Sequence, residues 1–96
     1  MLSKKDQLFI NKYIRRYFPK DEFSVFVFGS FARNEESNRS DIDIAIKGSL
    51  PIPPSSWQML ENDFVESSFE RKIVLIDYHR VDDKFKQIID SGGIEI

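Results

Sequence analysis

The chain has 96 residues and a mass of 11.3 kDa, so we expect one domain over residues 1–96 with a single small core. Hydrophobic residues make up 41% and charged residues 31% of the sequence, a balance that predicts a globular protein and excludes disordered and low-complexity classes. The 14 basic and 16 acidic side chains give a net charge of −2. The chain as a whole therefore does not attract polyanions, and we expect no direct nucleic-acid binding.

Residue types that are absent or rare narrow the chemistry further. The sequence has no cysteine, which excludes disulfides, thiolate metal sites and thiol nucleophiles. His79 is its only histidine, so a metal cage of several histidines is excluded. We expect His79 to be an exposed residue at the end of a strand rather than a catalytic base. No run reaches the roughly 18 to 20 apolar residues of a membrane span. We therefore expect a cytoplasmic protein without a membrane partner.

The N-terminal segment predicts a helix followed by a strand. Ser3 has Asp6 three residues after it, and apolar residues then recur at helical spacing, which predicts a capped amphipathic helix ending before Pro19. Residues 23–28 are mostly aromatic and β-branched, which indicates a buried strand. A Gly-Ser pair ends this strand, and the polar segment after it is expected to begin with a short helix.

The middle of the chain predicts a second strand, a loop and a second helix. Charged and apolar side chains alternate over residues 41–46, as in a strand with one solvated face. Three prolines within residues 48–56 predict a loop. Apolar residues at helical spacing over residues 57–64 then predict a helix capped by Ser55 or Ser56, in which Trp57 is expected to be a core residue.

The C-terminal part predicts a third strand and a last helix. Residues 72–77 form a short aliphatic run ending in Asp77, which indicates a strand. Residues 81–89 repeat apolar side chains at helical spacing, with Asp82 and Asp83 in the first turn and a Gly-Gly pair after the last turn. The predicted order is α-β-α-β-α-β-α.

Two motifs point to phosphate and metal chemistry. At Gly29-Ser30 the chain leaves a buried strand, so backbone amides and the Ser30 hydroxyl can donate hydrogen bonds to a phosphate. Asp41 and Asp43 are two positions apart on a strand and project to the same side, where their oxygens can bind Mg²⁺ that also contacts nucleotide phosphates. Taken singly, the first motif can be a plain turn and the second a solvated strand face.

Three polar residues near these motifs have two interpretations each. Arg33 and Arg39 can contact phosphate, although arginines in polar loops are usually solvated. Ser40 can hydrogen-bond a carboxylate or simply close a turn.

The combination of motifs resembles the minimal nucleotidyltransferases, the MNT proteins of the polymerase beta superfamily that occur beside HEPN-domain partners. The matching segments are Gly-Ser-Phe-Ala-Arg at residues 29–33, Ser-Asp-Ile-Asp-Ile-Ala-Ile at residues 40–46, and the closing helix with its glycine pair at residues 92–93. The resemblance implies an α/β (α+β) fold, with a small mixed β-sheet and helices packed mainly on one face.

The resemblance also implies the reaction, the site and the partner. An MNT antitoxin would transfer AMP from ATP, or a nucleoside monophosphate from another NTP, to a tyrosine of a HEPN ribonuclease toxin, with Mg²⁺ or Mn²⁺ as cofactor. Asp41 and Asp43 would be the catalytic metal ligands. The nucleotide would be bound by Gly29, Ser30, Arg33 and Ser40.

One departure from the family pattern concerns the third carboxylate. The pattern on the later strand is an apolar residue, Asp, two apolar residues and a second, non-catalytic Asp; here Val74 stands at the first Asp and Asp77 at the second. A valine cannot bind a metal. Residues 74 and 77 face opposite sides of a regular strand, so Asp77 could replace the missing ligand only in an irregular one. A lesser departure is Asn34, which replaces a glycine and tolerates left-handed backbone angles.

The missing carboxylate supports a rival interpretation, a noncatalytic protein that keeps the fold and neutralises its partner by binding it. A third class, the aminoglycoside nucleotidyltransferases, carries an additional helical domain for which this chain has no length. The sequence leaves open whether copies of the chain form a homo-oligomer.

Overall fold

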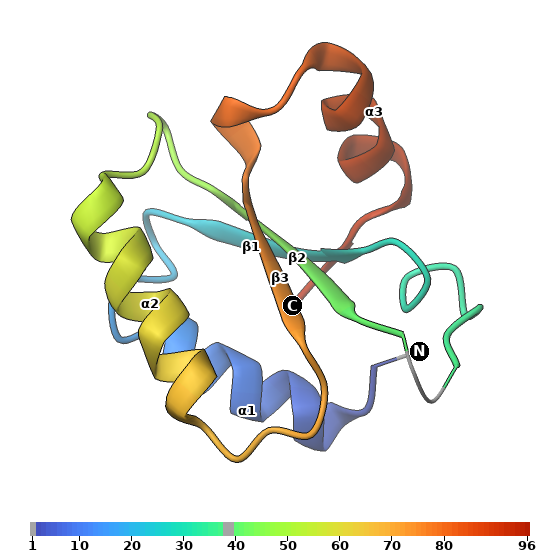
Figure 1. The fold of residues 1–96 in the computed structure, drawn as a ribbon. Helices are drawn as coiled ribbons and strands as arrows, with labels where there is room; N and C mark the ends of the chain where they lie inside the picture. Colours follow the sequence, from blue (N-terminus) through green and yellow to red (C-terminus); the bar gives the residue numbers. More distant parts are fainter. Residues whose placement is uncertain (1, 38–39) are drawn as a thin grey trace.

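A four-stranded mixed sheet forms the centre of the fold (Figure 1). The computed structural model describes residues 2–37 and 40–96. Its strands, in the spatial order β3-β2-β1-β4, are β1 (Ser24–Phe28), β2 (Ile42–Lys47), β3 (Ile73–Asp77) and β4 (Ile94–Glu95). β1 is antiparallel to both β2 and β4, whereas β2 and β3 are parallel.

Three α-helices cover the sheet, two of them on one face. α1 (Lys4–Ile14) and α2 (Pro54–Glu66) lie side by side (Figure 1) and pack on the larger part of the core. α3 (Asp83–Gly92) follows the 3-10 turn η1 (Tyr78–Arg80) and packs on the opposite face. The expected mixed sheet with helices mainly on one face is therefore confirmed. No helix among the described residues is long and apolar enough to span a membrane.

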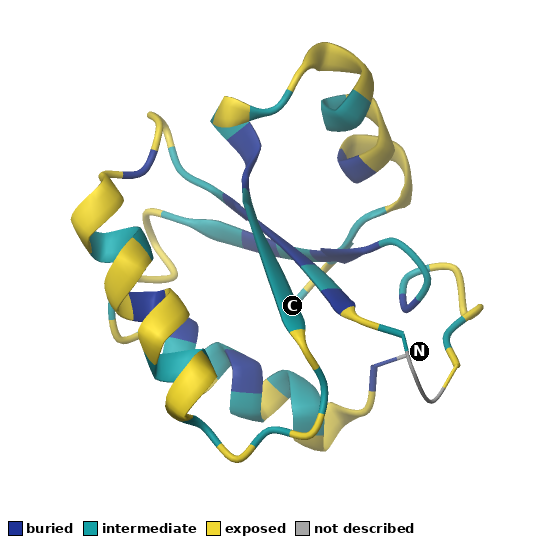
Figure 2. Ribbon diagram, in the orientation of Figure 1, coloured by how far each residue is buried: buried dark blue, intermediate teal, exposed yellow. Residues whose placement is uncertain are grey.

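The two-residue period of β2 divides its side chains between the two faces. Ile42, Ile44 and Ile46 are fully buried in the larger part of the core, beneath α1 and α2. Asp43 and Ala45 point to the face of α3, where Ala45 is buried in a smaller apolar cluster. Figure 2 shows the resulting pattern of buried strand segments and exposed helix surfaces. Lys47, at the other end of β2, shares this face and lies over the ring of Tyr78, so Asp43 is the acidic residue of β2 on the α3 face.

The predicted cap is confirmed at α1, whereas Asp82, expected in the first turn of α3, is the residue that caps it. Ser3 Oγ accepts a hydrogen bond from the Asp6 amide at 3.1 Å at the start of α1, and Asp82 caps α3. For α2 the predicted serine caps are wrong. That helix begins at Pro54, because a proline in the first turn needs no amide partner and already has helical φ.

Two further segments differ from the sequence prediction. Residues 29–34 form successive turns rather than a short helix, and Asn34, with a left-handed φ of 58°, ends them. The C-terminal residues add the short strand β4, which pairs with β1. The sequence did not predict this strand, because two residues are too few to show a strand pattern.

Candidate functional site

Asp41 and Asp43, the carboxylate pair, lie where β2 begins. Asp41 immediately precedes the strand and is exposed, whereas Asp43 is its second residue and is half-buried. In the sheet, Asp43 lies between Phe28, the last residue of β1, and Val74 of β3. The end of β1 and the Gly-Ser turn that follows it are thus brought next to the carboxylate pair.

Gly29 lies directly against the Asp43 carboxylate. Its φ of 73° belongs to the left-handed region that favours glycine. A Cβ atom built on Gly29 would overlap Oδ2 of Asp43 and lie 3.2 Å from its Cγ. The absence of a side chain therefore serves two purposes, because it permits the turn and leaves room for the carboxylate.

A substitution at Gly29 should affect both purposes. We expect Gly29→Ala to lower the free energy of unfolding by about 1–2 kcal/mol, the cost of a left-handed non-glycine residue, and to weaken metal-dependent nucleotide binding about tenfold by displacing Asp43. Chemical denaturation and calorimetric titration measure the two effects. Gly92→Ala is the matched control, since a Cβ there meets nothing within 4 Å. Equal nucleotide affinity in the two variants would remove Gly29 from the site.

The turn after Gly29 is closed by its own backbone. The Arg33 amide donates to the Gly29 carbonyl at 3.1 Å and the Glu35 amide to the Ser30 carbonyl at 2.9 Å. The left-handed Asn34 between these donors bears out the expectation that asparagine can stand where the family has glycine. The exposed Arg33 side chain pairs with Glu35, with 3.2 Å between Nε and Oε2.

Electrostatics link these residues to one another. Burial raises the pKa of the Asp43 carboxyl, the negative charge of Asp41 raises it further, and the positive charge of Arg33 lowers it in part. Two carboxylates that repel each other, one of them half-buried, form a site in which a bound cation would relieve the repulsion.

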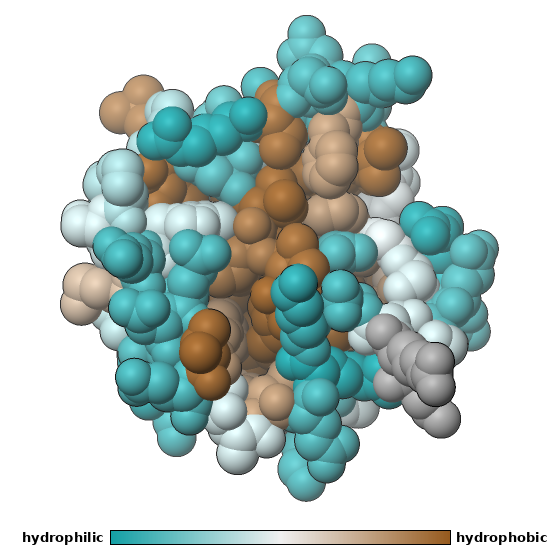
Figure 3. Space-filling view, viewed as in Figure 1, coloured by the Kyte–Doolittle hydropathy of each residue, from teal (hydrophilic) through white to brown (hydrophobic). Residues whose placement is uncertain are grey.

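Val74 occupies the place beside Asp43 at which the family pattern has its third carboxylate. Val74 is the direct neighbour of Asp43 in the parallel pair of β2 and β3, so both side chains point to the same face of the sheet. Apolar side chains gather over β3 in the middle of the molecular face in Figure 3, in keeping with the aliphatic sequence of that strand. Among the residues that the structure describes, no group of three or more His, Cys, Asp or Glu side chains could hold a metal ion.

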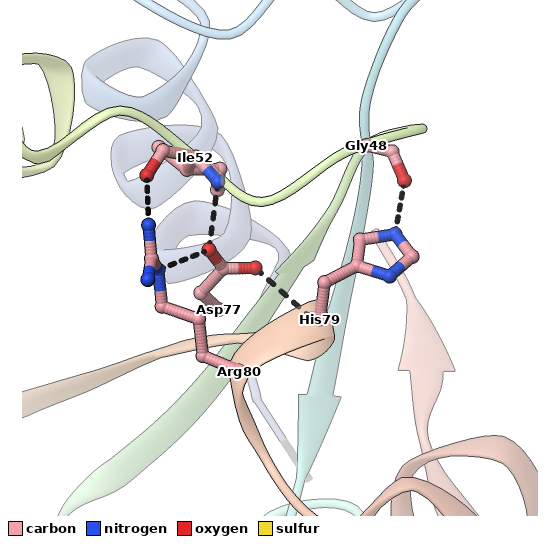
Figure 4. A network of polar contacts seen from close by, with 5 residues as sticks. All are labelled: Gly48, Ile52, Asp77, His79 and Arg80. Atoms are coloured by element: carbon pink, nitrogen blue, oxygen red, sulfur yellow. Dashed lines mark hydrogen bonds and ion pairs between the residues drawn. The ribbon is translucent and has the colours of Figure 1, made fainter.

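Asp77 lies away from the carboxylate pair and has a different task. It is three residues beyond Val74 on a regular strand and pairs with Ile46, so it faces the other side of the sheet. Its buried carboxylate accepts hydrogen bonds from the Ile52 amide at 2.8 Å, the His79 amide at 3.0 Å and Nε of Arg80 at 3.2 Å (Figure 4). The structure therefore does not bring Asp77 to the metal site.

The same network fixes the proline-rich loop to the end of β3. Arg80 also donates to the Ile52 carbonyl at 3.1 Å, and Nε2 of His79 lies 2.6 Å from the Gly48 carbonyl (Figure 4). His79 is thus half-buried and bound to the loop rather than exposed at a strand end. Trp57, as expected, packs against the main core.

Asp77→Asn should therefore act on stability alone. We expect a loss of about 3 kcal/mol in the free energy of unfolding. Asparagine accepts weaker hydrogen bonds than a carboxylate, and its NH₂ group would face donors where the carboxylate has a second oxygen. Nucleotide affinity should stay within twofold of wild type, and titration at a temperature where both proteins are folded measures it. A loss of affinity without a loss of stability would return Asp77 to the metal site.

Ser40 closes a turn in this structure, and its hydrogen bond to a carboxylate stays a prediction. Its hydroxyl accepts from the Ser37 amide at 2.8 Å, and its amide donates to the Ser37 carbonyl at 3.1 Å. Arg39 lies outside the described residues. A residue that the sequence did not single out, Arg71, donates to the carbonyls of Ser37 and Ser40. Contacts between a side chain and backbone more than 30 residues away leave no pattern in the sequence.

The carboxylate pair fits a single divalent cation. Carboxylate oxygens are the ligands that Mg²⁺ and Mn²⁺ prefer, and Mg²⁺ is commonly held by one or two carboxylates together with substrate phosphates. The exposed Asp41 and the space left by Gly29 are consistent with such a shared site. Among the described residues, no third His, Cys, Asp or Glu side chain joins this pair in a larger metal-binding group.

Comparison with known proteins gives relatives of one kind. The family described as "Polymerase beta, Nucleotidyltransferase" matches residues 10–96. "Probable protein adenylyltransferase MntA" of Haemophilus influenzae is 29% identical over 86 residues, which cover 90% of this chain and 75% of the relative. "Putative protein adenylyltransferase MJ0126" of Methanocaldococcus jannaschii is 36% identical over 74 residues, which cover 76% of this chain and 74% of the relative.

Solved structures share the fold. A rebuilt structure of a tri-AMPylated Shewanella oneidensis HEPN toxin in complex with MNT antitoxin contains a chain that matches with a TM-score of 0.66 at 23% identity. The match covers 93% of this chain and 69% of that chain.

Proposed function

The chain belongs to the polymerase beta nucleotidyltransferase family, and we propose that it transfers AMP from ATP to a HEPN toxin as the antitoxin of a toxin–antitoxin pair. The observation that carries this proposal is the carboxylate pair beside Gly29 at one end of the sheet. The names of the two curated relatives support a protein as acceptor. The complex of the Shewanella oneidensis proteins supports a HEPN toxin as that protein.

The proposed reaction joins an acceptor hydroxyl to a nucleotide. The hydroxyl oxygen forms a bond to the α-phosphorus of ATP, the bond from that phosphorus to the bridging oxygen breaks, pyrophosphate leaves, and the hydroxyl proton passes to solvent. Backbone amides of the turn after Gly29 and the Ser30 hydroxyl bind phosphate oxygens. Arg33, which pairs with Glu35 in this structure, can add its positive charge to these contacts with the phosphates.

Asp41 and Asp43 would hold the divalent cation, for which we propose Mg²⁺ or Mn²⁺. When bound, that cation would neutralise phosphate charge and polarise the phosphorus that is attacked. Val74 beside Asp43 can neither bind a cation nor take up a proton. The residues of this chain thus serve nucleotide binding better than activation of the acceptor, and we expect slow transfer.

Val74 favours a second candidate, a noncatalytic antitoxin that binds nucleotide and neutralises its partner by forming a complex. The two candidates differ in whether the carboxylate pair is needed for neutralisation. The cytoplasmic location and the oligomeric state stay predictions in either case.

Incubation of the chain with ATP, Mg²⁺ and the product of the adjacent reading frame, which we expect to be a HEPN protein, tests the proposal, with the intact mass of that protein as readout. We expect one or more AMP additions to the HEPN protein that disappear when Asp41 is replaced by asparagine. An unchanged mass, together with toxin neutralisation by the Asp41→Asn variant, would contradict transfer and support the noncatalytic antitoxin.

A further inference from the structure

Arg71 contacts both turns that border the carboxylate pair. Its Nη1 atom donates to the Ser37 carbonyl at 2.9 Å and to the Ser40 carbonyl at 3.3 Å. Its guanidinium group also lies over the ring of Phe31, 5.2 Å from the ring centroid. Ser40 precedes Asp41 and Phe31 follows Ser30, so one side chain links the phosphate-binding turn to the segment that enters β2.

The backbone on either side of Asp41 is fixed to the same short segment before β3. On the N-terminal side, the Ser40 carbonyl accepts from Arg71. On the C-terminal side, the Ile42 amide donates to the Lys72 carbonyl at 2.9 Å. Asp41 itself is exposed, so these two flanking contacts decide how its backbone is held.

Arginine suits this position for a geometric reason. A guanidinium group carries several donors in one plane and can stack on an aromatic ring while it donates, whereas a lysine ammonium group has no planar face. Phe31 is buried, with 5% of its surface exposed, and therefore offers a fixed platform. Charge alone would not require both the stacking and the two carbonyl contacts.

We propose that Arg71 is a positioning residue that fixes the backbone before Asp41 and thereby sets the direction of the Asp41 carboxylate beside Asp43. Arg71 acts through Asp41 and contacts neither cation nor nucleotide. The consequence for binding rests on the proposed function, because it requires that the carboxylate pair holds a cation with its nucleotide. The consequence for backbone order at Asp41 does not.

The test compares Arg71→Ala and Arg71→Lys with Arg16→Ala, an arginine whose side chain pairs with Asp63 between α1 and α2. One readout is the ¹⁵N order parameter of the Asp41 amide in the free protein, and the other is the Mn²⁺-dependent affinity for a non-hydrolysable ATP analogue. In Arg71→Ala we expect the order parameter to fall from about 0.85 to below about 0.6, with Ala45 unchanged. Analogue affinity should fall about tenfold, a loss of ~1.4 kcal/mol.

Arg71→Lys separates position from charge. We expect it to recover less than half of the lost binding energy, since lysine keeps the charge without the planar contacts, and Arg16→Ala to behave as wild type. Full recovery of order and affinity by lysine, or an unchanged order parameter in Arg71→Ala, would overturn the inference. If wild type binds no analogue, the proposed function fails, and the order parameter still decides the role of Arg71. Should the alanine variant not fold, Arg71→Lys carries the same comparison.

Discussion

Asp43→Asn is expected to abolish the metal-dependent binding of nucleoside triphosphate while the fold stays intact. Asparagine keeps the shape of the side chain next to Gly29 but removes the charge that a divalent cation requires. We expect affinity for an ATP analogue with Mg²⁺ to fall about 100-fold or more, at the upper end of losses for disturbed metal sites. Calorimetric titration with and without Mg²⁺ measures this change.

The same substitution should raise stability at neutral pH. Because burial and Asp41 raise the pKa of Asp43, the folded state binds this proton more tightly than the unfolded state does. The resulting stabilisation is complete below the ordinary aspartate pKa of 3.8 and is lost as the pH rises through the raised value. The Asp43→Asn variant has no proton to lose at this position. The difference in Tm between the variant and wild type should therefore grow as the pH rises from 3.8 through the raised pKa of Asp43, and should stay constant at higher pH.

Asp21→Asn is the matched control, because it removes the same charge from an exposed position after α1. It should leave nucleotide affinity unchanged within experimental error. If wild type, Asp43→Asn and Asp21→Asn bind the analogue equally well, Asp43 belongs to a solvated strand face and the metal site is wrong.

Local patterns allowed much of the fold to be predicted from the sequence. The alternation of residues 41–46 predicted the strand that the structure places at Ile42–Lys47, because side chains alternate wherever one face of a strand is buried. The shared direction of Asp41 and Asp43 stays a prediction. The odd separation of Val74 and Asp77 predicted opposite faces, which the regular β3 confirms. The two confirmed predictions succeeded because each depends on the geometry of a single strand.

Features that depend on distant segments could not be predicted in this way. Asp77 holds the Ile52 amide, 25 residues away in the chain, and Arg71 holds carbonyls 31 and 34 residues away. Such contacts appear only when the sheet has brought the loops together. Part of the candidate site, the fixed approach to Asp41, therefore needs the structure.

Val74→Asp is expected to give the chain the third carboxylate that the family pattern implies. Without metal, the new carboxylate lies beside Asp43 in the sheet, and repulsion together with partial burial should destabilise the fold by about 1–3 kcal/mol. With Mn²⁺ and an ATP analogue the loss should be recovered, so the metal-dependent rise in Tm should be larger than in wild type. AMP transfer to the HEPN protein should increase about tenfold or more. A metal ligand near the acceptor hydroxyl stabilises the transition state more than it strengthens the binding of the nucleotide.

Two controls separate the charge from its position. Val74→Asn has nearly the shape of aspartate without the charge, and Val65→Asp introduces the same charge at an α2 residue with 83% of its surface exposed. Neither should show the larger metal-dependent rise in Tm or faster transfer. A gain in Val74→Asn equal to that in Val74→Asp would show that metal binding is not the cause. Robust transfer by wild type, unchanged in Val74→Asp, would mean that a further ligand comes from the partner. No transfer by either protein, with toxin neutralisation preserved in Asp41→Asn, would assign the chain to the noncatalytic antitoxins.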